Sequence, residues 1–177
     1  MTKTIAIVSI LILMVVLIGL KEPKDTQQAL PDIPSFEVAD VAVLSIINKG
    51  QPTFSASKQG EAWLLRDGES PRPVNKDAVE QLLYDLQSMK PKRVVSRKTE
   101  RFQTFSVVDS EVILKNKQGR VLLDVFVGKP ATDLTSTYLR FADSKLVMTV
   151  NKVLTWQVKR TQDAWLLPTK VKEVPSE

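Results

Sequence analysis

An uncharged apolar segment near the N-terminus constrains this chain more than any other feature. Residues 5–20 read IAIVSILILMVVLIGL and lie between Lys3 and Lys21. As a helix rising about 1.5 Å per residue, the segment spans roughly 24 Å, somewhat less than the roughly 30 Å hydrocarbon core of a bilayer. The flanking lysines extend the span because their ammonium groups reach the headgroups. We therefore predict a single transmembrane helix, whose anchoring residues include Ile5, Ile10, Leu13, Val16 and Leu20.

The residues around this segment favour a retained anchor over a cleaved signal peptide. Signal peptidase requires small residues at positions −3 and −1 of the cut, and neither residues 18–20 nor residues 27–29 provide such a pair. The lysine counts on the two sides lean towards a cytoplasmic body. In contrast, a short N-terminus before the only apolar segment is typical of a signal-anchor that exports everything downstream. We predict export.

The chain contains no cysteine and no histidine. It therefore has no disulfide, no thiolate nucleophile, and neither the commonest general base nor the commonest metal ligand. These absences exclude serine–histidine and cysteine–histidine hydrolases and zinc enzymes. An enzyme of this composition depends on carboxylates, lysine or tyrosine. We predict no catalytic, metal or cofactor site and expect a protein that is not an enzyme.

Residues 76–89 contain the one clear amphipathic helix. Asn75 is a suitable N-cap, Asp77 suits the helix dipole in the first turn, and Pro91 ends the segment. One stripe of this helix is apolar. Its members are Val79, Leu82, Leu83, Leu86 and Met89.

Alternating apolar and polar residues predict strands before and after this helix. The expected strands cover residues 41–47, 53–58, 62–66, 92–96, 111–115, 121–127, 137–141 and 146–150. We expect residues 128–130 to stop the strongest strand, and Asn151 to cap a short helix through Trp156. Strands in groups around one helix predict an α+β fold with antiparallel meanders. The chain thus divides into an anchor (1–20), a proline-bearing linker (21–40), an α+β domain (41–168) and a flexible tail (169–177).

The order of these segments resembles the bacterial family called domain of unknown function 4340. The matching residues are Gly60, Trp63, Leu65, Val79, Leu82, Leu83, Leu86, Phe126, Val127, Gly128, Tyr138, Leu139 and Arg140. The resemblance extends over residues 41–167 and implies a bacterial envelope protein behind a transmembrane segment. Some relatives occur with auxiliary components of ABC transporters, and the family provides no catalytic residues. The chain departs from it at Phe105, Ser106 and Val107, where the family often has a glycine–leucine pair.

The densest charge lies in residues 90–101, with six basic residues against one acidic residue. A solvated connector is the simplest interpretation, and contact with anionic lipid or a protein partner is the alternative. Nucleic acid is not expected, because only Phe102 and Phe105 follow as stacking aromatics. The candidate contact residues of this segment are Lys92, Arg93, Arg97, Lys98 and Arg101.

Other candidate groups receive structural interpretations. Asp109 and Glu111 read as residues flanking a turn, and Asp124 reads as a side chain facing solvent from an edge strand. Tryptophans at the ends of strands and helices usually fill the core, which is the interpretation for Trp63, Trp156 and Trp165 rather than a ligand platform. Trp165 and Leu166 nevertheless begin the best candidate for an exposed apolar docking patch, which continues through Pro168.

We expect a single-pass protein of the bacterial inner membrane with its domain in the periplasm. Its expected role is that of an accessory or scaffold that binds other envelope proteins, with an ABC-type transporter as one candidate. Two alternatives remain open. One is a carboxylate-dependent envelope enzyme, for instance one acting on glycans, and the other is a cytoplasm-facing domain that binds anionic lipid.

Overall fold

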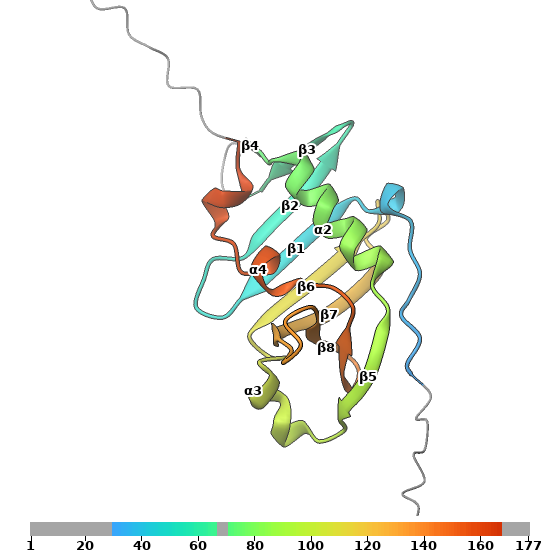
Figure 1. The fold of residues 1–177 in the computed structure, drawn as a ribbon. Helices are drawn as coiled ribbons and strands as arrows, with labels where there is room; N and C mark the ends of the chain where they lie inside the picture. Colours follow the sequence, from blue (N-terminus) through green and yellow to red (C-terminus); the bar gives the residue numbers. More distant parts are fainter. Residues whose placement is uncertain (1–29, 67–70, 168–177) are drawn as a thin grey trace, which may run out of the picture.

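The computed structural model describes residues 30–66 and 71–167 (Figure 1). The predicted anchor at residues 1–20 and the predicted tail at residues 169–177 lie outside the described residues. In residues 30–66 and 71–167, no helix is both long and apolar enough to cross a membrane.

One antiparallel sheet of nine strands organises the described residues, in the order β4-β3-β2-β1-β6-β7-β8-β9-β5. The strands are β1 (Val43–Asn48), β2 (Phe54–Gln59), β3 (Ala62–Leu65), β4 (Arg72–Pro73), β5 (Pro91–Ser96), β6 (Ser110–Lys115), β7 (Val121–Pro130), β8 (Thr137–Phe141) and β9 (Val147–Val150). The α+β class and the two antiparallel meanders are confirmed. The meanders form a single sheet because β1 pairs with β6, and β5 returns to the far edge beside β9.

Helix α2 (Lys76–Ser88) covers one face of this sheet, which we call the inner face (Figure 1). The Asn75 side chain accepts a hydrogen bond from the Ala78 N–H at 3.2 Å, so the predicted N-cap is confirmed. The predicted stripe of α2 is also confirmed, because its leucines and Val79 are fully buried. Each buried side chain of this size stabilises the fold by about 1.5–3 kcal/mol.

The domain begins earlier than the sequence indicates. Phe36 is buried in the main core, and Ile33 and Val38 pack against that core. The Gln87 amide of α2 donates to the Phe36 carbonyl oxygen at 3.0 Å, just before the short helix η1 (Val38–Asp40). The predicted linker boundary at residue 40 is therefore wrong, because apolar side chains of this segment are buried with the sheet.

A second, smaller core lies on the opposite face, which we call the outer face. The short helices η2 (Thr99–Arg101) and α3 (Phe102–Phe105) lead into it. Its buried residues are Phe105, Val107, Ala131, Tyr138 and Val147. The sequence showed no signal for these helices, since each covers only one turn.

Strand β7 continues through Gly128 to Pro130, so the predicted stop after Val127 is wrong. Gly128 serves a different purpose, because the chain of the second core crosses directly over it. A side chain at this position would overlap the carbonyl oxygen of Phe105 and crowd Val107 and Tyr138. The glycine is required by this close approach.

We therefore expect Gly128→Ala to destabilise the domain by about 2 kcal/mol, because the added methyl group displaces backbone in a packed region. Urea denaturation would measure the loss. Replacement of Gly119 by alanine is a useful comparison. The added methyl group meets no neighbouring atom there, so the only cost is the backbone strain of a φ of 79°. Equal stability of Gly128→Ala and the unmodified chain would contradict the close approach.

Ser106 ends α3 in the left-handed region, with φ 56°. Glycine is the residue that adopts such a conformation at a helix C-terminus without steric cost. We expect Ser106→Gly to stabilise the domain by about 0.5–1 kcal/mol, after allowing for the greater freedom of glycine in the unfolded chain. Thermal unfolding would detect the gain, and the same change at Ser55 within β2 should instead lower stability.

The last described helices, α4 (Thr155–Val158) and η3 (Gln162–Trp165), lie on the inner face. Asn151 does not cap α4, as had been expected, because its side chain accepts a hydrogen bond from the Lys90 N–H at 2.7 Å instead. Residue Leu154 precedes α4 and makes no side-chain cap. The main-chain bridge between Val74 and Leu166 then fastens the end of the chain beside β4.

The two edges of the sheet are irregular. Strand β4 has two residues, and the main chain of Leu167 donates to the Pro73 carbonyl oxygen at 3.2 Å. Strand β5 begins with a proline and pairs with β9 through two register shifts, which fall around Lys92 and Val95. Each shift leaves one residue outside the regular ladder.

Candidate interaction surfaces

The basic segment predicted from the sequence forms a groove at one end of the molecule. The groove has a volume of about 380 Å³ and is lined by Val94, Val95, Ser96, Arg97, Lys98 and Arg101. We call it the basic groove. Its valines are half-buried and its three basic residues are exposed, so the groove combines an apolar wall with positive charge. The Ser96 hydroxyl accepts the Lys98 N–H at 3.1 Å and holds the turn after β5.

Lys92 lies apart from the basic groove. Its ammonium group binds the Asp133 carboxylate at 2.7 Å and the Ser136 hydroxyl at 2.9 Å. Lys92 and then Ser136 hold the pKa of Asp133 well below its usual range. Lys92 thus links β5 to the β7–β8 hairpin, whereas its neighbour Arg93 is exposed.

Arg140 is the most highly connected side chain on the outer face. Arg140 is only 7 % exposed. Its guanidinium lies 4.5 Å from the centroid of the Phe102 ring and 4.1 Å from the centroid of the Phe126 ring. The same group donates to the carbonyl oxygens of Val107, Phe141, Ala142 and Ser144 at 3.0–3.3 Å. Arg140 therefore joins β7, β8 and α3. The sequence indicated this linking role of Arg140 only in that it places an arginine within an apolar strand.

Glu111 and Asp124 lie together beside Arg140. Strand β7 is internal, between β6 and β8, so the prediction that Asp124 lies on an edge strand is wrong. Burial raises the pKa of Glu111, the charge of Asp124 and a hydrogen bond to it raise this pKa further, and Arg140 lowers it. The structure thus couples Glu111 to Asp124, whereas the sequence had paired it with Asp109.

We expect Glu111→Gln to stabilise the folded chain at pH 7, by less than about 1 kcal/mol since the pair is partly solvated. The sign follows from the raised pKa. Protonated Glu111 contributes its full share of the folding free energy below the pKa that it has in the unfolded chain. This share is lost as the pH rises through the higher pKa of the folded chain. The gain should accordingly vanish below about pH 4. Denaturant titrations at several pH values would test this, with exposed Glu100→Gln as the control.

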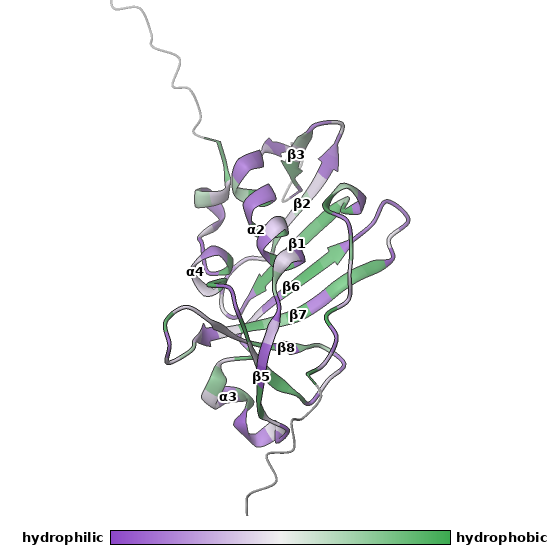
Figure 2. Cartoon of the chain, turned by 45° about the vertical axis from the view of Figure 1, so that its right-hand side comes forward, coloured by the Kyte–Doolittle hydropathy of each residue, from purple (hydrophilic) through white to green (hydrophobic). Residues whose placement is uncertain are grey.

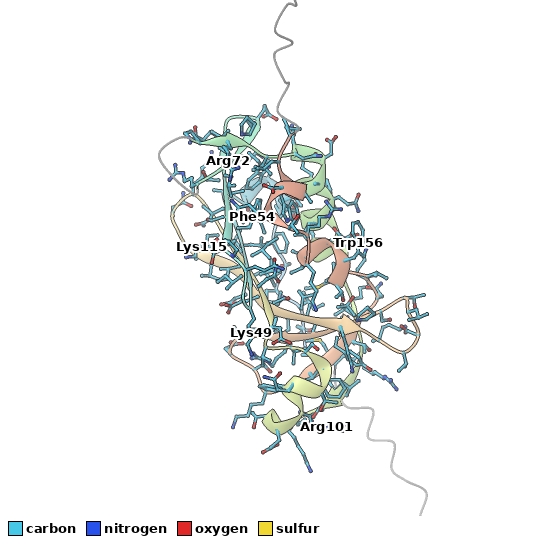
Figure 3. The ribbon with its side chains drawn as sticks, turned by 90° about the vertical axis from the view of Figure 1, so that its left-hand side faces the viewer. Lys49, Phe54, Arg72, Arg101, Lys115 and Trp156 are labelled. Carbon is cyan, nitrogen blue, oxygen red and sulfur yellow. The ribbon has the colours of Figure 1, made fainter. Side chains whose placement is uncertain are left out.

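Much of the outer face carries no helix. Residues paired across antiparallel strands point to the same face, and the pairs Ile47–Glu111, Ser45–Ile113 and Ile113–Asp124 trace this surface across β1, β6 and β7. In Figure 3, α2 and α4 lie to the right of the strands, and Lys49 and Lys115 mark the other side. We call this surface the open face. Its side chains include Val43, Ser45, Ile47, Glu111, Ile113 and Asp124.

The tryptophans differ in their positions. Trp63 and Trp165 are buried, as predicted for residues that fill the core, whereas Trp156 is 55 % exposed. The expectation of an exposed patch beginning at Trp165 is wrong, because that ring is 1 % exposed and stacks on Phe54 with centroids 5.0 Å apart. Leu166 is half-buried, and Leu167 is exposed.

Comparison with known proteins gives one match. A family described as a domain of unknown function, DUF4340, matches residues 63–174. The match begins at Trp63 and so covers a shorter range than residues 41–167. No curated protein and no solved structure matches the chain.

Proposed function

The chain belongs to the DUF4340 family of domains of unknown function, and from this premise we propose that it is a membrane-tethered binding domain of the bacterial envelope. The N-terminal segment would hold it in the inner membrane, with the domain in the periplasm. There it would act as an accessory or scaffold of an envelope complex, with an ABC-type transporter as one candidate.

The open face is the observation that carries this proposal. It combines apolar side chains with hydroxyls such as Ser45 and Ser55, whose oxygens lie 3.3 Å apart. Ile47, 37 % exposed, lies beside Glu111 on the neighbouring strand. A flat surface of mixed polarity on rigid strands is suited to another protein surface, whereas small molecules are usually held in concave pockets.

Site-specific photocrosslinking in membranes would test the proposal. A crosslinking residue at Ile47 or Ile113 on the open face should capture one defined membrane-complex protein. The matched control is Tyr84, 55 % exposed on α2, which should capture nothing specific. Equal capture from both faces, or none from the open face, would contradict the assigned surface. A reporter fused after Glu177 and active only in the cytoplasm would contradict the periplasmic location.

The coupled carboxyls support a second candidate, a carboxylate-dependent enzyme acting on envelope glycans. A carboxyl group with a raised pKa beside a second carboxyl group is one arrangement from which general acid–base catalysis can be built. On the open face, burial and then Asp124 raise the pKa of Glu111. Release of sugars from envelope glycans by the unmodified chain, and its loss in both Glu111→Gln and Asp124→Asn, would favour the enzyme over the binding domain.

A further inference from the structure

The basic groove and the start of the described chain lie at the same end of the molecule. In Figure 1, β5 descends towards α3, and the blue start of the described chain lies at the same end of the molecule. In Figure 3, Arg101 lies at one end of the molecule and Arg72, on β4, lies at the other.

This placement limits how far the groove can lie from the membrane. Nine residues, 21–29, separate the predicted anchor from Leu30. Even a fully extended chain of that length reaches only about 30 Å. A domain tethered in this way keeps the start of its described chain, and with it the β5 end, within about that distance of the headgroups.

The chemistry of the groove matches that of an anionic phospholipid surface. Lys98 and Arg101 of the groove are exposed cations, and Arg93, just before the groove, is a third. The segment after β5 is coloured mostly hydrophilic in Figure 2. Val94 and Val95 add apolar surface in the same groove. A phospholipid presents a phosphate next to hydrocarbon, and basic residues near a negatively charged bilayer are attracted over about a Debye length.

We propose that the end formed by β5, η2 and α3 docks on anionic phospholipid headgroups of the membrane that holds the anchor. The inference rests on the tether in the proposed function, and it deepens that function by assigning an orientation. With the basic groove against the bilayer, the strands stand away from the membrane and the open face is presented sideways. The cation–π contact of Arg101 with Phe105, 5.2 Å from guanidinium to ring centroid, ties the groove to the second core.

Single cysteines provide the test, because the chain has no cysteine of its own. Thr99→Cys marks the groove end and Ala62→Cys marks the start of β3, and both positions are exposed. The full-length chain, carrying an environment-sensitive dye at either site, is reconstituted into phosphatidylcholine vesicles with or without about one third phosphatidylglycerol. A quencher attached to the headgroups then reports the distance to the surface.

With phosphatidylglycerol present, we expect the Thr99→Cys dye to be quenched at least about threefold more than the Ala62→Cys dye. The difference should fall in neutral vesicles and at about 0.5 M salt. Arg93→Glu with Lys98→Glu should abolish it. The matched control, Lys117→Glu with Arg120→Glu, makes the same change in net charge on the exposed β6–β7 turn and should retain it.

The inference is overturned if the Thr99→Cys dye responds equally in neutral and anionic vesicles, or if the Ala62→Cys dye is quenched instead. It is also overturned if the two charge reversals have the same effect. Flotation of the chain with vesicles in alkaline carbonate tests the tether alone, and photocrosslinking tests the protein partner. Failure of lipid docking is thus distinguishable from failure of the proposed function.

Discussion

Replacing Arg140 by alanine is expected to destabilise the domain by about 3–5 kcal/mol, a large share of the roughly 5–15 kcal/mol by which an ordinary domain is stable. The guanidinium is buried between the rings of Phe102 and Phe126, and each such contact contributes about 0.5–2 kcal/mol. Its removal also leaves several carbonyl oxygens at the β8–β9 turn without their donor. Buried acceptors left in this way cost about 1–3 kcal/mol.

Arg140→Lys separates the charge of this residue from its geometry. Lysine keeps the positive charge beside Glu111 and Asp124, but it lacks the planar fork that stacks on rings and donates to several oxygens. We expect Arg140→Lys to recover less than half of the lost stability in urea denaturation. Full recovery would show that charge alone determines the contribution of Arg140. Arg140→Ala leaves the Glu111 carboxylate without its neighbouring cation. Adding Glu111→Gln removes that carboxylate and should therefore restore part of the lost stability.

Trp165→Ala is expected to cost about 3–5 kcal/mol, the usual range for removing a large buried aromatic side chain. Trp165 is fully enclosed by the main core, and its carbonyl oxygen accepts the Asn75 N–H at 2.8 Å at the start of α2. Loss of the ring therefore opens a cavity and loosens the N-terminus of the main helix. Thermal unfolding would measure the effect.

The control for this prediction is Trp156→Ala. Trp156 is exposed and contacts Arg160 with 4.6 Å from guanidinium to ring centroid, so its removal should cost about 0.5–1 kcal/mol. If Trp165 were a docking residue on the surface, the two substitutions would have similar small effects on stability. Their expected difference separates the core interpretation from the surface interpretation.

Most elements could be predicted from the sequence because their signals are local. The alternation of β1 and β6 and the stripe of α2 each lie within one short segment. The pairing of β1 with β6 could not be predicted in the same way, because it joins residues about 70 positions apart, such as Leu44 and Leu114. Pairing over such a distance depends on the whole fold.

The candidate surfaces were only partly predictable for the same reason. The basic groove follows from consecutive charges, so the sequence identified its residues. The coupling of Glu111 to Asp124 depends on the β6–β7 register, and the burial of Arg140 depends on the crossing of α3. Trp165 looked like part of an apolar patch, because nothing in its own segment indicates that Phe54 and α2 enclose it.

The irregular edges of the sheet have a consequence for molecules that meet at high local concentration. A long, straight strand edge offers a row of unpaired main-chain groups and recruits strands from other copies, which leads to aggregation. Here β4 is two residues long, and β5 combines Pro91, two bulges and neighbouring positive charges. Neither edge provides a template for a tenth strand. Copies crowded together therefore stay separate, and recognition of other molecules is left to side chains.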